Sequence, residues 1–186
     1  MSTDDGVQRW IDAALDELAE GGVERVRVEV VAQRLGVTKG GFYRRFRDRQ
    51  ALLEALLEQW IEGRIATIAR QTELDGATPA ERLQATIRIF AERANAQGMA
   101  IELAIRQWAR SDPDAAEAVA CVDTARVEAV QPLYERMGYS AADAQARALL
   151  FYAFIFGQGL IFLHASPAER TRLVEACADA VIGSAP

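Results

Sequence analysis

The chain has 186 residues, of which 51% are hydrophobic and 26% charged, with five prolines and two cysteines. This hydrophobic fraction can supply a substantial core, which excludes wholesale disorder. The net charge of −6 excludes general affinity for polyanions, so a nucleic-acid contact would need a local basic face. Abundant Ala, Leu, Glu and Arg, with few β-branched runs, predict an all-α fold.

The first predicted helix spans residues 5–19. Its apolar residues recur at helical spacing and form one stripe, and Gly21 and Gly22 follow as a stop signal. The stripe consists of Val7, Trp10, Ile11, Ala14, Leu15 and Leu18.

Two short helices joined by a tight turn are predicted next. Val30, Val31 and Leu35 share one side of the first of them. Gly36 stands where a helix that ends in a left-handed residue favours glycine. Thr38 is a good N-cap for the second helix, over residues 39–46. Two short helices joined by a glycine-containing turn form a helix-turn-helix, a DNA-binding arrangement.

The charge of this region supports binding to DNA. Residues 25–49 hold eight basic and two acidic residues, a balance of +6 that leaves −12 on the rest of the chain. The second helix itself carries Lys39, Tyr43, Arg44 and Arg45. A solvated, salt-bridged helical hairpin is the alternative explanation of the charge alone. The glycine turn, the cap and the aromatic residue at Tyr43 favour DNA binding.

The same region resembles the DNA-binding domain of the tetracycline-repressor (TetR) family of transcription regulators. The resemblance covers residues 7–57, with Leu-Gly-Val-Thr-Lys-Gly at 35–40, Phe-Tyr-Arg-Arg-Phe at 42–46 and Leu-Leu at 52–53. It implies phosphate contacts by Thr38, Tyr43, Arg45 and Arg49. It also implies that the floor of the groove is faced by Arg27, Val28, Lys39, Gly40 and Gly41.

Gly41 departs from the pattern of the family, which usually has Thr, Ser or Ala at this position. Two consecutive glycines weaken the start of the second helix by about 1 kcal/mol each. They also remove side chains that could contact bases. We therefore expect Lys39 and the start of the preceding helix to carry more of the sequence recognition.

Capping residues divide the rest of the chain into further helices. Asp48 precedes a long helix that ends near residue 70, and Thr78 and Ser166 each open a capping box with Pro at the first helical position. Asp112 and Ser140 start two more. The sequence thus predicts about nine helices, with a helix-turn-helix domain at 1–47 and a connecting helix plus a larger ligand-binding and dimerisation domain at 48–186.

The resemblance also implies a small-molecule site in the C-terminal helices. Large apolar residues and polar residues in apolar surroundings are the candidates there: Phe90, Asn95, Glu102, Arg106, Trp108, Tyr134 and Phe151. The alternative is that these residues simply fill a core. The acidic surplus of this part favours a neutral or cationic effector over an anionic one.

The segment 148–163 is almost entirely apolar. It is shorter than the about 20 residues that span a bilayer, so a helix buried partly against a second subunit is the preferred interpretation. Together with the last helix it predicts a homodimer interface, and no membrane partner. The interface residues are expected to be Phe156, Gly157, Gly159, Leu160, Leu173 and Cys177.

Signals for catalysis are weak. His164 is the single histidine of the chain, and no phosphate loop, nucleophile elbow or zinc motif is present in the sequence. We therefore expect no enzyme activity, cofactor or metal. Cys121 and Cys177 are interpreted as reduced thiols, and the N-terminus has no secretory pattern, so a cytoplasmic location is expected.

The sequence as a whole predicts a dimeric repressor that a small-molecule effector releases from double-stranded operator DNA. An activator with the same DNA contacts is one alternative. The other is an effector-binding helical protein whose first domain no longer recognises a DNA site.

Overall fold

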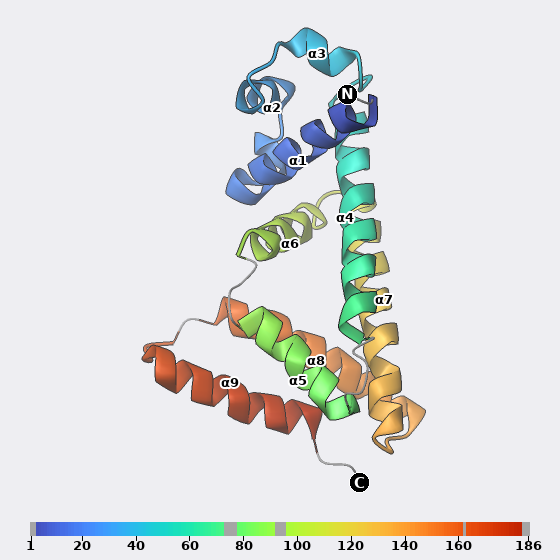
Figure 1. Ribbon diagram of the computed structural model, residues 1–186, viewed down its shortest axis with the longest axis vertical. Coiled ribbons are helices and arrows are strands. Elements are labelled where there is room, and N and C mark those ends of the chain that lie inside the picture. The colour runs from blue at the N-terminus through green and yellow to red at the C-terminus, as the bar shows by residue number, and fades with distance from the viewer. Residues whose placement is uncertain (1–2, 73–77, 92–95, 162, 184–186) are drawn as a thin grey trace. The chain divides into compact units, whose positions relative to one another are not determined.

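The computed structural model describes residues 3–72, 78–91, 96–161 and 163–183 (Figure 1). Over these ranges the chain forms nine α-helices and one short 3-10 turn, η1, and no strand, which confirms the predicted all-α fold. The elements are α1 (Thr3–Gly21), η1 (Val23–Arg25), α2 (Val28–Arg34), α3 (Lys39–Tyr43), α4 (Arg49–Thr72), α5 (Pro79–Ala91), α6 (Ala96–Trp108), α7 (Pro113–Arg136), α8 (Ala141–Leu160) and α9 (Pro167–Ile182).

The predicted capping residues begin the helices as expected. The side chain of Asp48 accepts a hydrogen bond of 2.9 Å from the backbone N–H of Ala51, and Asp112 does the same for α7. Ser140 caps α8. Thr78 and Ser166 form reciprocal capping boxes with the glutamates three residues later. These local hydrogen bonds satisfy backbone donors that the first turn of a helix leaves free.

The helices gather into two compact units. The first comprises Met1–Arg64 and Asn95–Val122, and the second Ile65–Ala94 and Asp123–Pro186. The sequence predicts two domains that are each continuous along the chain, with a boundary at residue 47. Each of the two compact units instead combines two separate stretches of the chain. The first unit includes α6 because α6 packs against α1.

The core of the first unit is built around α1. This helix contacts η1, α2 and α6, and its Trp10 ring lies edge-on to Phe42 of α3 with centroids 5.4 Å apart. Phe42 also stacks on Phe46 at 5.4 Å and is fully buried. Leu52 and Leu56 of α4 are fully buried as well. The apolar stripe of α1 therefore packs in the core of the domain that holds the helix-turn-helix.

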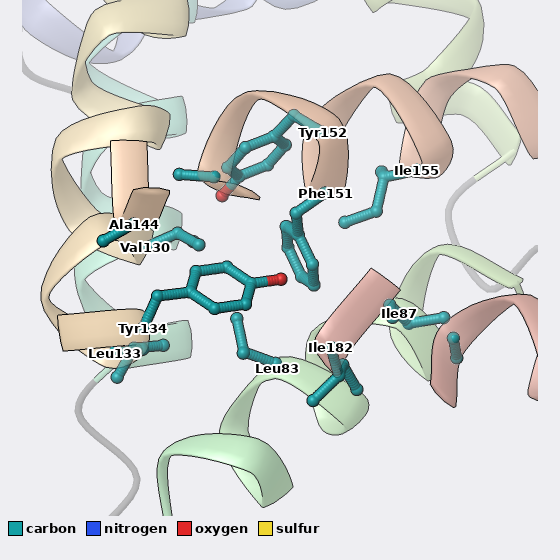
Figure 2. Close-up of a cluster of buried hydrophobic side chains, with 12 residues drawn as sticks. Leu83, Ile87, Val130, Leu133, Tyr134, Ala144, Phe151, Tyr152, Ile155 and Ile182 are labelled. Atoms are coloured by element: carbon teal, nitrogen blue, oxygen red, sulfur yellow. The ribbon is translucent and has the colours of Figure 1, made fainter. Parts of the chain in front are cut away.

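The core of the second unit lies among α5, α7, α8 and α9. Figure 2 shows the buried side chains of Leu83, Tyr134, Phe151 and Ile182 converging on one centre. The Tyr134 hydroxyl donates a hydrogen bond of 3.1 Å to the carbonyl of Val181, and burial raises the pKa of this phenol well above its usual range. α9 packs on both α5 and α8. None of the described helices combines the length and apolar character that a bilayer crossing requires.

Candidate nucleic-acid interface

The turn between α2 and α3 has the geometry that the sequence predicts. Gly36 adopts a left-handed φ of 67°, and the backbone N–H of Val37 reaches back to the carbonyl of Ala32 at 3.0 Å. Thr38 occupies the N-cap position with extended φ and ψ of −84° and 156°. Its hydroxyl makes no capping hydrogen bond and stays exposed. The turn thus fixes the direction of α3 while the Thr38 side chain remains accessible.

α3 is shorter than predicted. The sequence pattern indicated a helix over residues 39–46, but regular helix ends at Tyr43. The backbone N–H groups of Arg45 and Phe46 both point to the carbonyl of Phe42, at 2.8 and 3.0 Å, and close the segment with a tight turn. The glycines at 40 and 41 lower the helix propensity of this segment, which accounts for the early end.

α3 divides into a buried and an exposed side. Phe42 anchors it to the core, whereas 62% of Tyr43 is exposed. Lys39, Gly40 and Arg44 are exposed too. We call the exposed side chains of α3, its N-cap and the start of α2 the candidate DNA face: Arg27, Glu29, Thr38, Lys39, Tyr43 and Arg44.

Two predicted groove contacts are placed differently. Val28 is only 9% exposed in the first turn of α2, so little of its side chain is accessible for the expected contact with the groove floor. Gly41 is half-buried, and a Cβ built on it would lie 3.9 Å from the Trp10 ring. Both positions face the core because α2 and α3 each bury one side against α1 and its neighbours.

Several of the basic residues have structural partners. Arg25 and Arg34 both bind the carboxylate of Glu17, which is 3% exposed, and both also bind Glu20. Burial raises the pKa of Glu17, but the hydrogen bonds and charges of Arg34 and Arg25 outweigh it and hold the pKa below the ordinary 4.5. This cluster ties η1 and α2 to α1, so these two arginines position the helix-turn-helix.

Arg49 and Arg45 also have partners within the chain, although the family resemblance implied phosphate contacts for both. The Arg49 guanidinium donates to the carbonyls of Val23 and Val26, each at 2.6 Å. Arg45 donates to the carbonyl of Gly41 at 3.0 Å. The start of α4 is thereby held against η1. Arg45 and Arg49 thus bind backbone carbonyls, and a phosphate would have to compete for them.

The remaining basic residues lie on the candidate DNA face. Arg27 and Arg44 are exposed, and neither guanidinium makes a hydrogen bond or ion pair with any residue that the structure describes. Lys39 pairs with Glu29 at 2.5 Å, an acidic partner that the sequence pattern did not indicate. The face therefore offers cationic and hydroxyl donors to phosphates, on a short helix of the kind that enters the major groove.

The residues proposed for a ligand site are distributed over both units. Glu102, Arg106 and Trp108 lie on α6 in the first unit, where Glu102 is buried and binds Arg106 at 2.9 Å. Trp108 lines a pocket of about 630 Å³ beside the end of α1, together with Leu18. Asn95 lies outside the described residues.

In the second unit, Tyr134 and Phe151 are fully buried core residues. Phe90 is half-buried and meets the Phe156 ring edge-on at 6.4 Å. Arg126, which the sequence did not single out, is 2% exposed and lies 5.0 Å from the centroid of the Phe156 ring. A lone arginine on a long helix gives no sequence signal of burial.

The residues proposed for a dimer interface lie on α8 and α9. Leu160 and Leu173 are about half exposed, at 52% and 48%, and Cys177 and Gly157 are half-buried. Phe156 instead packs largely inward, on Phe90 and Tyr152. The burial of Gly159 lies outside what the structure describes. Four further residues of the predicted interface segment 148–163, not singled out individually from the sequence, are exposed too: Leu149, Leu150, Ile161 and Leu163.

Comparison with known proteins agrees with this arrangement. Residues 11–56 match the family described as bacterial regulatory proteins, tetR family. No curated protein sequence matches the chain significantly.

Three solved structures share the fold over almost the whole chain. A transcriptional regulator from Rhodococcus sp. Rha1 is 21% identical, with 95% of this chain and 94% of that chain covered and a TM-score of 0.74. A TetR-family transcriptional regulator from Agrobacterium tumefaciens is 18% identical, with 96% and 98% covered and a TM-score of 0.77. A protein from Saccharomonospora viridis, assigned as a transcriptional regulator and solved in complex with choline, is 16% identical, with 97% and 96% covered and a TM-score of 0.74.

At these identities the solved structures establish the fold, and the match over residues 11–56 adds the family. That match spans most of α1, the left-handed turn at Gly36 and the exposed α3. Residues 11–56 thus match the tetR family of bacterial regulatory proteins, and the chain shares its fold with solved transcriptional regulators.

Proposed function

We propose that the protein is a dimeric repressor that binds an operator through α3 and leaves it when a small-molecule effector binds. The observation that carries the proposal is the candidate DNA face, where Thr38, Lys39, Tyr43 and Arg44 are exposed on one short helix that Phe42 anchors from behind. Anchored, exposed and basic, α3 meets the requirements of a helix that docks in the major groove.

Dimerisation is supported by the exposed apolar residues of the second unit. Leu149, Leu160 and Leu173 expose between 48% and 63% of their surface. Exposed apolar side chains gathered on two helices mark an interaction site on a soluble domain. In a dimer, α8 and α9 would pack on their two-fold mates and present two α3 helices to successive turns of DNA, about 34–36 Å apart.

An effector site is supported by the pocket beside Trp108. Its lining includes Leu18 of α1, Val23 and Glu24 of η1, and Leu103 of α6. A ligand there would bear directly on α1, which holds the helix-turn-helix. The choline bound to the Saccharomonospora protein is a small cation, which agrees with the neutral or cationic class favoured by the acidic surplus.

A gel shift tests the proposal. The DNA is the region upstream of the protein's own gene, with a random-sequence duplex as competitor. We expect a retarded complex that the random duplex does not displace, and a weaker complex when Arg44 is replaced by alanine. Absence of any preference over the random duplex would leave the protein as an effector-binding helical protein without an operator.

The effector part has its own test. Choline and other small amines are titrated into the protein–DNA complex, and release of the DNA and tryptophan fluorescence are followed together. Replacement of Trp108 should change the response and leave DNA affinity nearly intact. Should that variant lose folding and DNA binding together, Trp108 belongs to the core alone. A reporter gene placed behind the upstream DNA separates repression from activation.

A further inference from the structure

Glu29 is an acidic side chain on an otherwise basic face. It stands in the first turn of α2 and is exposed, and its carboxylate oxygen Oε1 lies 2.5 Å from Nζ of Lys39 at the start of α3. The other acid of residues 25–49, Asp48, has a structural task because it caps α4 and binds Arg47. An acid within the candidate DNA face weakens attraction to phosphates, so its presence there requires a reason.

Stability of the fold is a weak reason. The side chains of Lys39 and Glu29 are 56% and 59% exposed, and exposed ion pairs contribute little to the free energy of unfolding. A carboxylate in the first turn of α2 is stabilised by the positive end of the helix dipole. This small contribution to stability does not require contact with α3. The hydrogen bond from Lys39 lowers the pKa of Glu29, which favours its charged carboxylate form.

The pair changes what Lys39 can bind. A lysine that is already neutralised gains little from a phosphate, because the carboxylate competes for it and is itself repelled by the DNA backbone. The ammonium group nevertheless has three donors, and the carboxylate has a second oxygen. A donor and an acceptor held 2.5 Å apart complement two neighbouring groups of opposite kind.

A G·C base pair presents such groups in the major groove. Guanine offers the acceptors O6 and N7, for which lysine is a common partner, and cytosine offers the N4 donor, for which glutamate is the partner. An A·T pair presents the same kinds of groups in another order, because its one donor, N6 of adenine, lies between the acceptors N7 and O4. Two adjacent acceptors for the ammonium group, followed by a donor for the carboxylate, occur only in G·C.

We propose that Glu29 is a specificity-determining residue that acts as one unit with Lys39: the pair recognises a G·C base pair in each half-site and withholds Lys39 from phosphates of other sequences. The inference rests on the proposed DNA binding by α3. In random DNA the pair stays closed and adds neither a phosphate contact nor counterion release. At the operator both partners gain hydrogen bonds to the base pair.

The test compares Glu29→Gln with the wild type on two duplexes. One is selected by the wild-type protein from a randomised library, and the other has random sequence. Fluorescence anisotropy gives the affinity at several salt concentrations. Glu58→Gln is the matched control, because Glu58 is exposed on α4 and its replacement changes the net charge of the same unit equally. Thermal unfolding verifies that both variants are folded.

For Glu29→Gln we expect about three- to tenfold tighter binding to the random duplex, with the slope of log K against log salt steeper by about two per dimer, because Lys39 of each copy is free to bind a phosphate. The ratio of selected to random affinity should fall at least about tenfold, since one base pair of each half-site is no longer discriminated. In a Lys39→Ala background, Glu29→Gln should give no gain in slope.

Two outcomes would contradict the inference in distinguishable ways. If the wild type selects a sequence and Glu29→Gln behaves like Glu58→Gln in slope and ratio, Glu29 has no part in recognition while DNA binding stands. If the wild type enriches no sequence at all, the proposed function fails, and the role of Glu29 fails with it. The inference is supported if the half-sites selected by the wild type share a G·C pair at a fixed position, and if Glu29→Gln binds equally well when that pair is replaced by A·T.

Discussion

Gly36 and Gly40 are only four residues apart, yet their conformations differ in kind. Gly36 has a φ of 67°, a region that L side chains rarely adopt. Gly40 lies within α3, and a Cβ built on it would meet nothing nearer than the Thr38 hydroxyl at 3.7 Å. Glycine is therefore required at the first position and only tolerated at the second.

Replacement by alanine should change stability in opposite directions at these two positions. Gly40→Ala should raise the free energy of unfolding by about 0.5–1 kcal/mol, because alanine loses less backbone entropy in a helix. Gly36→Ala should lower it by about 1–2 kcal/mol, the cost of a left-handed alanine. Urea denaturation measures both. A destabilising Gly40→Ala would mean that α3 is not helical at that position.

Glu17 makes the stability of the first unit depend on pH. Its pKa is lowered in the folded protein, so the contribution of the carboxylate is present above its ordinary pKa of 4.5 and is lost as the pH falls through the folded value. Glu17→Gln should cost about 1–3 kcal/mol at pH 7, since Arg25 and Arg34 lose a charged acceptor.

The same substitution should flatten the acid side of the stability curve below pH 4.5. Thermal unfolding across the pH range measures this effect, with the exposed Glu58→Gln as the control. A stability curve of Glu17→Gln that runs parallel to the wild type down to low pH would show that Glu17 is not the group responsible.

At the scale of elements, the bounds set by side-chain caps could be predicted from the sequence, because an Asp, Ser or Thr cap acts within four residues. The end of α3 could not be predicted from the sequence. It depends both on the low helix propensity of the two glycines and on the tight turn at Phe42, and the sequence does not show how the two combine. Partners far apart in sequence were also missed. Arg49 binds carbonyls more than twenty residues away, and no local pattern reports such a contact.

The placement of Arg49 and Arg44 gives two arginine variants with different effects. Arg49→Ala should destabilise the first unit by about 1–3 kcal/mol, because the carbonyls of Val23 and Val26 lose a charged donor. Arg44→Ala should leave stability within about 0.5 kcal/mol of the wild type, as for other exposed positions. It should nonetheless weaken binding to every DNA sequence.

Thermal unfolding and DNA anisotropy on the same samples separate the two effects. Arg49→Lys keeps the charge but replaces the planar guanidinium, whose separate nitrogens reach the two carbonyls, by a single nitrogen, so we expect it to remain destabilised. Equal melting temperatures for the wild type and Arg49→Ala would mean that Arg49 is not needed for the fold. Its expected role as a direct phosphate contact would then be favoured again.

At the scale of the whole molecule, the sequence predicted the all-α fold and the helix-turn-helix, but no local pattern indicated that α6 belongs to the same compact unit as the helix-turn-helix. α6 joins the first unit because of contacts with α1, and these depend on residues some eighty positions apart, such as Gln97 and Asp16. For the same reason Trp108, expected in a C-terminal sensing domain, lies in the unit of the helix-turn-helix.

If the protein dimerises through α8 and α9, a single charge introduced in that interface should prevent dimerisation. Gly157→Glu adds a side chain where a Cβ meets no atom within 4 Å of this chain, so the fold can accept it. In a two-fold interface the new carboxylate would face its own mate in a desolvated seam. We expect a monomer by light scattering and loss of DNA binding, although residue 157 is far in sequence from α3.

Thr124→Glu is the control, because Thr124 is exposed on α7 of the same unit. It should remain dimeric and bind DNA normally. A wild-type protein that is monomeric at micromolar concentration would contradict the proposed assembly, and a dimeric Gly157→Glu would place the interface elsewhere.

If two copies of α3 recognise DNA together, selection from a randomised duplex library should reveal it. We expect enrichment of a pseudo-palindrome whose half-sites are centred about one helical turn, some 10 base pairs, apart. Enrichment of a single asymmetric half-site, or of no sequence at all, would contradict it.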